Sequence, residues 1–217
     1  MRYERKIPLG SYKIRDIQGL IKYNSARFCE IFHQRRVNSI YFDDMERSCY
    51  ISNLNGEDIR FKYRLRWYGE MYGLIKPVFE IKVKNGLSGD KRTYELDSFY
   101  LEEDSNGSKI LNQINFDKLP RDVFCKIQLM RPVLMVTYLR RYYISYDKKF
   151  RLTTDSEIRH AKIPHIVSKL KFNLESDDLI EIKYEIKNDN LADKIINEFP
   201  FRVDKNSKYA NGIAQVL

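Results

Sequence analysis

Residues 58–69 read DIRFKYRLRWYG, and this alternation of side chains predicts a β-strand with two unlike faces. One face carries only cationic side chains, and the other carries only apolar or aromatic ones. The cationic face comprises Arg60, Lys62, Arg64 and Arg66, and the opposite face comprises Ile59, Phe61, Tyr63, Leu65 and Trp67. A row of like charges repels itself unless water or a polyanion offsets the repulsion. The face is therefore either the wet side of an antiparallel sheet or a polyanion-binding surface.

Other stretches of the chain repeat this division into an apolar and a charged face. In residues 179–187 (LIEIKYEIK) and 76–86 (KPVFEIKVKNG), glutamate and lysine alternate with apolar residues. The repetition favours the polyanion-binding interpretation. We expect strands at 2–7, 26–33, 37–43, 58–67, 76–86, 91–97, 132–145, 148–158 and 179–187, with a tight link between the second and third.

The expected helices are fewer than the strands and mostly amphipathic. They fall at 12–23, 45–53, 107–114, 120–130 and 190–199, with Ser11 as the N-cap of the first and Asp189 or Asn190 as that of the last. Two architectures fit these elements. The sheet either packs its apolar faces into a core and shows its charge to water, or closes into a barrel with the charge inside and helices outside.

The composition points to an anionic partner. The 217 residues include 39 Lys and Arg against 30 Asp and Glu, which gives a net charge of +9. The three cysteines, Cys29, Cys49 and Cys125, are widely spaced and form no CxxC motif, so neither a disulfide framework nor a zinc site is expected.

The chain also lacks the sequence signals of export and of membrane insertion. The first ten residues, MRYERKIPLG, contain no apolar signal segment, and no apolar run approaches the ~18 residues of a membrane-spanning helix. We therefore expect a cytoplasmic protein with no transmembrane segment, whose membrane association would come through a membrane-protein partner. The sequence does not predict an oligomeric state.

Six of these stretches, taken in order, resemble a known family. The runs RFKYRLRWYG, EIKVK, TYLRRYY, RLTTDSEI, EIKYE and KNSKYANG look like the VTC domain, which belongs with the CYTH proteins among the triphosphate tunnel metalloenzymes. The resemblance extends from Glu4 to about Gly212. It implies an α+β fold in which a closed antiparallel β-barrel, the triphosphate tunnel, has a charged bore and is covered outside by a few α-helices. Residues 1–217 would form a single VTC-type tunnel domain.

The resemblance also implies an activity. VTC domains are similar to polyphosphate polymerases, which move the γ-phosphoryl group of ATP onto a growing polyphosphate chain and depend on Mn²⁺ or Mg²⁺. We therefore expect a metal-dependent phosphotransferase with ATP and polyphosphate or triphosphate as partners. A tunnel triphosphatase that hydrolyses triphosphate or NTP, and a non-catalytic polyphosphate-binding module, are the alternatives.

The residues that match the family's motifs are expected to form the site. Those given a catalytic role are Lys6, Arg64, Arg66, Lys82, Arg140, Arg151 and Lys208. Those expected to bind substrate are Tyr138, Lys205 and Ser207 by motif, and Lys62 and Lys183 because they lie on the same strand faces. The metal would be held by Glu181 and Glu4. Asp155 completes the Arg-x-x-x-Asp element that begins at Arg151.

One departure from the family pattern affects the metal site. CYTH relatives begin with Glu-x-Glu-x-Lys, whereas this chain has Arg2-Tyr3-Glu4-Arg5-Lys6. The arginine in place of the first glutamate makes this end more cationic, which favours a longer polyanion over a small triphosphate.

A basic, strand-rich protein could also bind nucleic acid. Binding of single strands needs aromatic side chains on the charged face, where bases can stack. Phe61, Tyr63 and Trp67 instead lie opposite the cations, so we expect no nucleic-acid partner.

Overall fold

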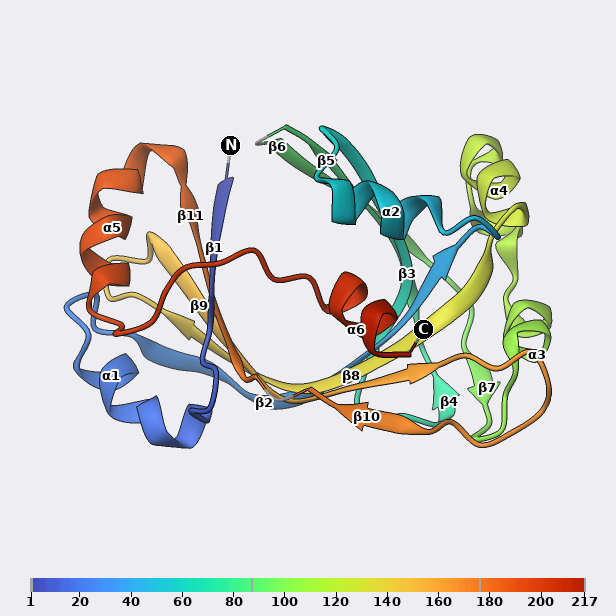
Figure 1. The fold of residues 1–217 in the computed structure, drawn as a ribbon, viewed down its shortest axis with the longest axis horizontal. Helices are drawn as coiled ribbons and strands as arrows, with labels where there is room; N and C mark the ends of the chain where they lie inside the picture. The colour runs from blue at the N-terminus through green and yellow to red at the C-terminus, as the bar shows by residue number, and fades with distance from the viewer. Residues whose placement is uncertain (1, 87, 176, 217) are drawn as a thin grey trace. The chain divides into compact units, whose positions relative to one another are not determined.

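The computed structural model describes residues 2–86, 88–175 and 177–216 (Figure 1). Its strands are β1 (Arg2–Pro8), β2 (Cys29–Asp43), β3 (Ile59–Tyr68), β4 (Gly73–Ile75), β5 (Val78–Asn85), β6 (Ser88–Glu95), β7 (Phe99–Leu101), β8 (Arg131–Ile144), β9 (Phe150–Lys162), β10 (Phe172–Leu174) and β11 (Leu179–Glu185). Its α-helices are α1 (Gln18–Tyr23), α2 (Ser48–Asn55), α3 (Gly107–Gln113), α4 (Arg121–Gln128), α5 (Asp189–Asn197) and α6 (Lys208–Val216). Short 3₁₀ turns are η1 (Ile14–Ile17), η2 (Phe116–Lys118) and η3 (Ile186–Asn188).

The strands form one large sheet and one small one. Hydrogen bonds join the large sheet in the order β1-β11-β9-β8-β2-β3-β5-β6, with β10 paired to β9, and β4 pairs with β7 separately. The strand pairs β1–β11, β11–β9, β2–β3, β3–β5 and β5–β6 are all antiparallel. The α+β class with a large antiparallel sheet is therefore confirmed. The chain divides into two compact units, and β2, β8 and β9 each contribute residues to both.

The first unit comprises the N-terminal segment through Arg35, Tyr138–Ile158 and Leu174–Asn206. The apolar face of its β1–β11–β9 ladder is covered by α1 and α5, both of which lie on one side of these strands in Figure 1. Burial of this face removes apolar surface from water, which is the main favourable term for the unit. Its core includes Ile7, Ile21, Leu152, Ile180, Ile182, Ala192 and Phe199.

The second unit comprises Arg36–Thr137, Arg159–Asn173 and the C-terminal segment from Ser207. Within it β3 pairs with β2 on one side and with β5 on the other. Leu65, Trp67 and Phe79 are buried on the apolar face, as the alternation predicts. Helix α6 packs on the opposite, charged face, where Tyr209 stacks on Tyr41 of β2 with ring centroids 5.0 Å apart (Figure 1).

Several predicted elements need correction. The predicted strands 26–33 and 37–43 are parts of one 15-residue strand, β2, because Gln34-Arg35-Arg36 contains none of the residues that favour a turn. The predicted helix 12–23 is a 3₁₀ turn followed by the short helix α1, and Lys13 rather than Ser11 occupies the N-cap position. The Asp16 side chain accepts a hydrogen bond from the Lys13 backbone N–H at 2.8 Å. This bond fixes the start of η1, so the helical segment begins two residues later than predicted.

Two further helix ends differ from the sequence-based expectation. The N-cap of α5 is Asn188, because η3 precedes the helix and shifts its first turn. The tail from 205 onward was predicted only as basic and then apolar, but it contains α6. Ser207 begins that helix: its hydroxyl accepts the Ala210 N–H at 3.2 Å and its carbonyl accepts the Asn211 N–H at 2.8 Å.

No helix of the described residues is both long and apolar enough to cross a bilayer.

Candidate functional site

The charged face of the second unit is organised in cross-strand rows. Lys62 of β3 lies opposite Lys82 of β5, and Lys82 lies opposite Lys91 of β6. The neighbouring row consists of Arg64, Glu80 and Thr93. Like charges placed directly opposite each other destabilise a sheet. These two rows contain the cations Lys62, Lys82, Lys91 and Arg64 and the carboxylate of Glu80, so their net charge is positive, which suits an anion.

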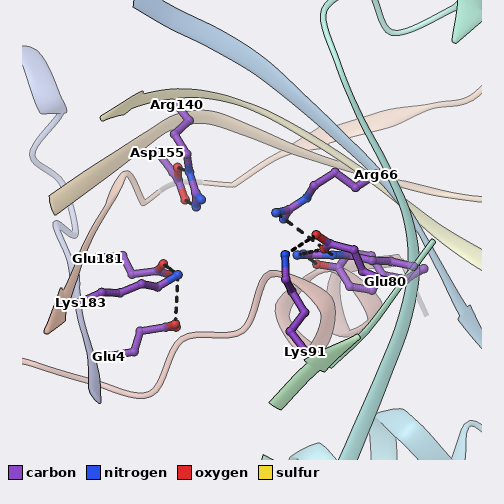
Figure 2. Close-up of polar contacts among 10 residues, drawn as sticks. Glu4, Arg66, Glu80, Lys91, Arg140, Asp155, Glu181 and Lys183 are labelled. Carbon is purple, nitrogen blue, oxygen red and sulfur yellow. Dashed lines mark hydrogen bonds and ion pairs between the residues drawn. The ribbon is translucent and has the colours of Figure 1, made fainter. Parts of the chain in front are cut away.

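Glu80 gathers the cations around it, and we call Arg64, Arg66, Glu80 and Lys91 the arginine–glutamate cluster (Figure 2). Arg64 contacts Glu80 Oε2 through Nε at 2.7 Å and through Nη2 at 2.6 Å. Arg66 Nη1 lies 3.8 Å from the same oxygen, and Lys91 Nζ lies 3.0 Å from Oε1. One carboxylate therefore fixes the positions of three cationic side chains.

The Arg64–Glu80 pair at the centre of the cluster is buried, which rules out a simple wet face for this part of the sheet. Arg64 is 5% exposed and Glu80 is 3% exposed. Burial raises the pKa of Glu80, but the attraction of Arg64 and Arg66 outweighs it and lowers the pKa to about 2. Glu80 is therefore charged at neutral pH, and the cluster retains a net positive charge.

Tyr41 adds a polar contact to the same cluster. Arg64 Nη1 donates a hydrogen bond to the Tyr41 hydroxyl at 3.0 Å. Burial raises the pKa of Tyr41, but the positive charges of Arg64, Arg66 and Lys208 outweigh it, so the net shift is downward. The phenol oxygen therefore lies in a strongly positive environment.

The Ser-Lys-Tyr element meets the charged face where α6 begins. Lys62 Nζ donates to Ser207 Oγ at 2.8 Å, so two predicted substrate-binding residues are joined directly. Lys208 is half-buried in the first turn of the helix. The Tyr209 hydroxyl donates to the buried Asp43 carboxylate, whose oxygens also accept the Cys49 and Tyr50 N–H groups at 2.9 and 3.1 Å. These contacts hold α6 against β2 and α2.

On the charged face of the first unit, acidic and basic side chains lie opposite each other on neighbouring strands. Glu4 of β1 lies opposite Lys183 of β11, which lies opposite Arg151 of β9, and Lys6 lies opposite Glu181. We call Glu4, Lys6, Glu181 and Lys183 the lysine–glutamate cluster; Figure 2 shows Glu4, Glu181 and Lys183 converging. Lys183 Nζ lies 2.7 Å from Glu181 and 3.4 Å from Glu4, and Lys6 Nζ lies 3.0 Å from Glu4.

The lysines of this cluster are held firmly. Burial lowers the pKa of Lys183, but Glu181 and Glu4 outweigh it and raise the pKa above its ordinary value. Lys6 Nζ also donates to the Asn206 carbonyl oxygen at 2.7 Å. Lys205, predicted to bind substrate, is exposed.

The Tyr-x-Arg and Arg-x-x-x-Asp elements also meet in the first unit. Arg140 of β8 makes a two-pronged contact with Asp155 of β9, at 2.6 and 2.7 Å, and its guanidinium lies 5.2 Å from the Tyr138 ring centroid (Figure 2). Asp155 is fully buried, so the charge of Arg140 is balanced within the protein. Arg151 lies beside Lys183 on the same face and is exposed.

The donor set for a metal ion consists of the two predicted glutamates. No group of three His, Cys, Asp or Glu side chains in the described residues could hold a metal. Mg²⁺ is commonly held by one or two carboxylates together with substrate phosphates. Glu4 and Glu181 contact the same ammonium group, Lys183, so they already converge on one positive charge. They fit a hard divalent cation that takes its other ligands from a phosphate substrate.

Sequence reasoning missed three members of the site. Glu80, Tyr41 and Lys91 were not among the predicted residues, although they surround Arg64 or lie opposite Lys82. The sequence did contain a signal for Glu80 and Lys91. Glu80 lies two residues before Lys82, and Lys91 two residues before Thr93, so each pair shares one face of its strand. Tyr41 gave no such signal, because its partner Arg64 lies on another strand.

Comparison with known proteins gives one family and a set of similar structures. A family model described as the VTC domain matches residues 4–217. The PH1819 protein of Pyrococcus horikoshii OT3 is similar in structure, with a TM-score of 0.56 and 12% identity over 99% of each chain. A Vibrio parahaemolyticus protein described as a candidate adenylate cyclase has a TM-score of 0.55 and 8% identity, covering 98% of this chain and 97% of that one. At these identities the structures show a shared fold.

Proposed function

Because the chain belongs to the VTC domain family of triphosphate tunnel metalloenzymes, we propose that it moves the γ-phosphoryl group of ATP onto polyphosphate. In this proposal residues 1–217 act as one tunnel domain, whose sheet closes into a barrel around the substrate. The reaction depends on Mn²⁺ or Mg²⁺, and a membrane-protein partner would bring the enzyme to a membrane.

The observation that carries the proposal is the excess of cations on the second unit's charged face. Lys62, Lys82 and Lys91 lie side by side across three strands, next to a buried Arg64–Glu80 pair. Phosphoryl transfer needs mainly positioning and stabilisation of charge, since the reacting group passes through a loose transition state. Fixed arginine forks and lysine point charges supply both.

Each group of residues has its own task in this proposal. Arg64 and Arg66, held by Glu80, and Lys62 and Lys82 bind the phosphate oxygens. Lys208 adds a charge at the start of α6, where Ser207 donates or accepts a hydrogen bond. On the first unit, Lys6, Lys183, Arg151 and Lys205 bind further phosphates, while Arg140 and Tyr138 form a positioned pair beside them.

The metal would be held by Glu4 and Glu181. When bound there, a divalent ion would supply positive charge that offsets the negative charge developing on the phosphate oxygens. Around it, Lys183 and Lys6 hold the two carboxylates in place. No protein nucleophile is needed, because the terminal phosphate of the acceptor chain attacks.

The test is an assay with ATP and Mn²⁺ or Mg²⁺ that measures polyphosphate on a gel and free phosphate in solution. We expect wild-type protein to form chains, and expect Arg64→Ala, Lys82→Gln and Glu181→Ala to lower the rate by about 10²-fold or more. Lys82→Gln removes a half-buried charge and tests the site without breaking the buried Arg64–Glu80 pair. The control is Arg15→Ala, whose side chain is 83% exposed, and it should retain full activity.

Other outcomes of the assay would replace the proposal. Free phosphate without chains would identify a tunnel triphosphatase. Polyphosphate binding without either product, unchanged by Glu181→Ala, would identify a binding module.

A further inference from the structure

A small cavity in the second unit lies away from the residues of the proposed site. It has a volume of about 30 Å³ and is bordered by the C-terminal turn of α6, through Ile213 and Val216. Four basic side chains line it, and we call it the basic cavity. They are Arg47, Arg131, Lys162 and His165.

Among the residues that the structure describes, no carboxylate side chain borders the basic cavity. The remaining lining residues are Pro132, Val133 and Ile163. Over the described residues, Arg47, Arg131 and Lys162 also form no ion pair elsewhere, in contrast to Arg64 or Arg140. Three cations have therefore been brought to one small space without a counter-charge.

The end of α6 gives only part of an explanation. A helix C-terminus carries about half a negative charge, and that charge attracts nearby cations. Half a charge cannot balance three cations. The cavity therefore has room, both electrostatically and sterically, for an anionic group.

The backbone at Arg47 supplies independent support. Arg47 is the N-cap residue of α2 and has φ of +59°, in the left-handed region that favours glycine. Its side chain does not cap the helix, because Asp44 accepts the Ser48 N–H and Asp43 accepts the Cys49 N–H. A glycine at this position would relieve the backbone strain without loss of a helix cap. We therefore infer that the Arg47 side chain has a role other than capping.

We propose that the basic cavity binds a single phosphoryl group or similar tetrahedral oxyanion. Arginine forks match phosphoryl oxygens, and lysine adds a point charge. The volume is close to that of one water molecule in the liquid, so the cavity can take an oxygen of one compact group but not the interior of a chain. The group could be free orthophosphate, the end of a polyphosphate chain or a phospholipid headgroup, because all three present the same oxygens.

The test is a titration of methyl-labelled protein with inorganic phosphate, at constant ionic strength, followed by NMR. Ile163, Ile213 and Val133 report on the cavity, since their side chains line it. We expect their signals to shift and saturate in wild type. We expect the apparent Kd to rise at least about tenfold in Arg47→Gly and in the double variant Arg131→Gln, Lys162→Gln.

Two comparisons make the result specific. Arg47→Gly should keep or raise the melting temperature while weakening phosphate binding, since glycine fits the left-handed backbone. A control double variant, Lys22→Gln with Lys194→Gln, removes the same charge from exposed positions of the first unit and should bind phosphate as wild type does. Unshifted cavity methyls, or an unchanged Kd in Arg47→Gly, would overturn the proposal.

Competition then separates the sources of the phosphoryl group. Tripolyphosphate and vesicles containing phosphatidic acid are each added to the phosphate-saturated protein, and the tighter competitor identifies the source. The site stands apart from the proposed reaction, because Arg64→Ala should slow chain formation by about 10²-fold or more and leave the shifts of Ile163 and Ile213 unchanged.

Discussion

Glu80 shows how one residue can determine the state of several others. Its carboxylate contacts Arg64, Arg66 and Lys91, and it is almost fully buried. Without it, a buried arginine would lack its counter-charge, and removal of one partner from a buried ion pair typically costs about 3–5 kcal/mol. Glu80 is therefore a positioning residue, since it acts through the arginines and not on the substrate.

We expect Glu80→Gln to destabilise the protein by about 3–5 kcal/mol at pH 7, because it leaves Arg64 buried without a carboxylate. Urea unfolding measures this change. Glu95→Gln, which alters an exposed residue of β6, is the control and should change stability by less than about 0.5 kcal/mol. Equal stabilities of Glu80→Gln and wild type would contradict the role assigned to Glu80.

The same residue predicts a dependence of stability on pH. The pKa of Glu80 falls from its ordinary 4.5 to about 2 on folding, so the unfolded chain takes up a proton at higher pH than the folded one. Its contribution is complete above pH 4.5 and is lost as the pH falls through about 2. The difference in unfolding free energy between wild type and Glu80→Gln should shrink by on the order of 3 kcal/mol across this range.

At the scale of elements, α6 is the part of the chain that completes the charged face of the second unit. It is held by Tyr209 on Asp43, by the stacking of Tyr209 on Tyr41, and by close packing at Gly212. A Cβ added at Gly212 would lie 2.5 Å from His160 Cδ2 and 2.7 Å from Leu134 Cδ2. The glycine thus allows the helix to approach the sheet.

We expect Gly212→Ala to destabilise the protein by about 1–3 kcal/mol, because the new methyl group has no space. The matched control is Gly19→Ala in α1, where a Cβ would meet nothing within 4 Å. Alanine favours a helix over glycine, so this control should be neutral or stabilising by up to about 1 kcal/mol. Urea unfolding compares the two, and a Gly212→Ala variant as stable as the control would show that α6 can move away freely.

At the scale of the whole molecule, the net charge of +9 leads us to expect an anionic partner. Of the aromatic residues opposite the cations on β3, Tyr63 and Trp67 are only 6% and 2% exposed, so they cannot serve as a stacking platform, and Phe61 alone is exposed, at 37%. The expected partner is thus a polyanion without bases.

Polyphosphate should bind with an affinity that falls at least about tenfold between 50 and 200 mM NaCl, because the contacts are ionic. Fluorescence anisotropy with labelled polyphosphate measures this. Single-stranded DNA at the same phosphate concentration should displace little of it, since Tyr63 and Trp67 are buried and cannot stack on bases. Equal competition by DNA would favour a nucleic-acid-binding protein instead.

The sequence predicted the strands whose side chains alternate strongly, but it did not predict elements that depend on contacts between residues far apart in the chain. The two-faced pattern of 58–67 and 179–187 predicted β3 and β11 within a few residues, because the period of a strand is local. The single long β2 was predicted as two strands, since its exposed first half and buried second half read as separate segments. Helix α6 was missed because its stability comes from Tyr41, Asp43 and His160, all distant in the chain.

The sequence by itself determined the class of fold, the charged faces of the strands, the excess of positive charge and the family. These follow from local periodicity, composition and ordered motifs, which need no knowledge of distant contacts. Only the tertiary structure decided which charges meet. Arg140 meets Asp155, and Arg64 and Lys91 both meet Glu80, while Lys62, Lys82 and Lys91 share one row. Pairing across strands is a property of register, and register is set by the packing of the whole sheet.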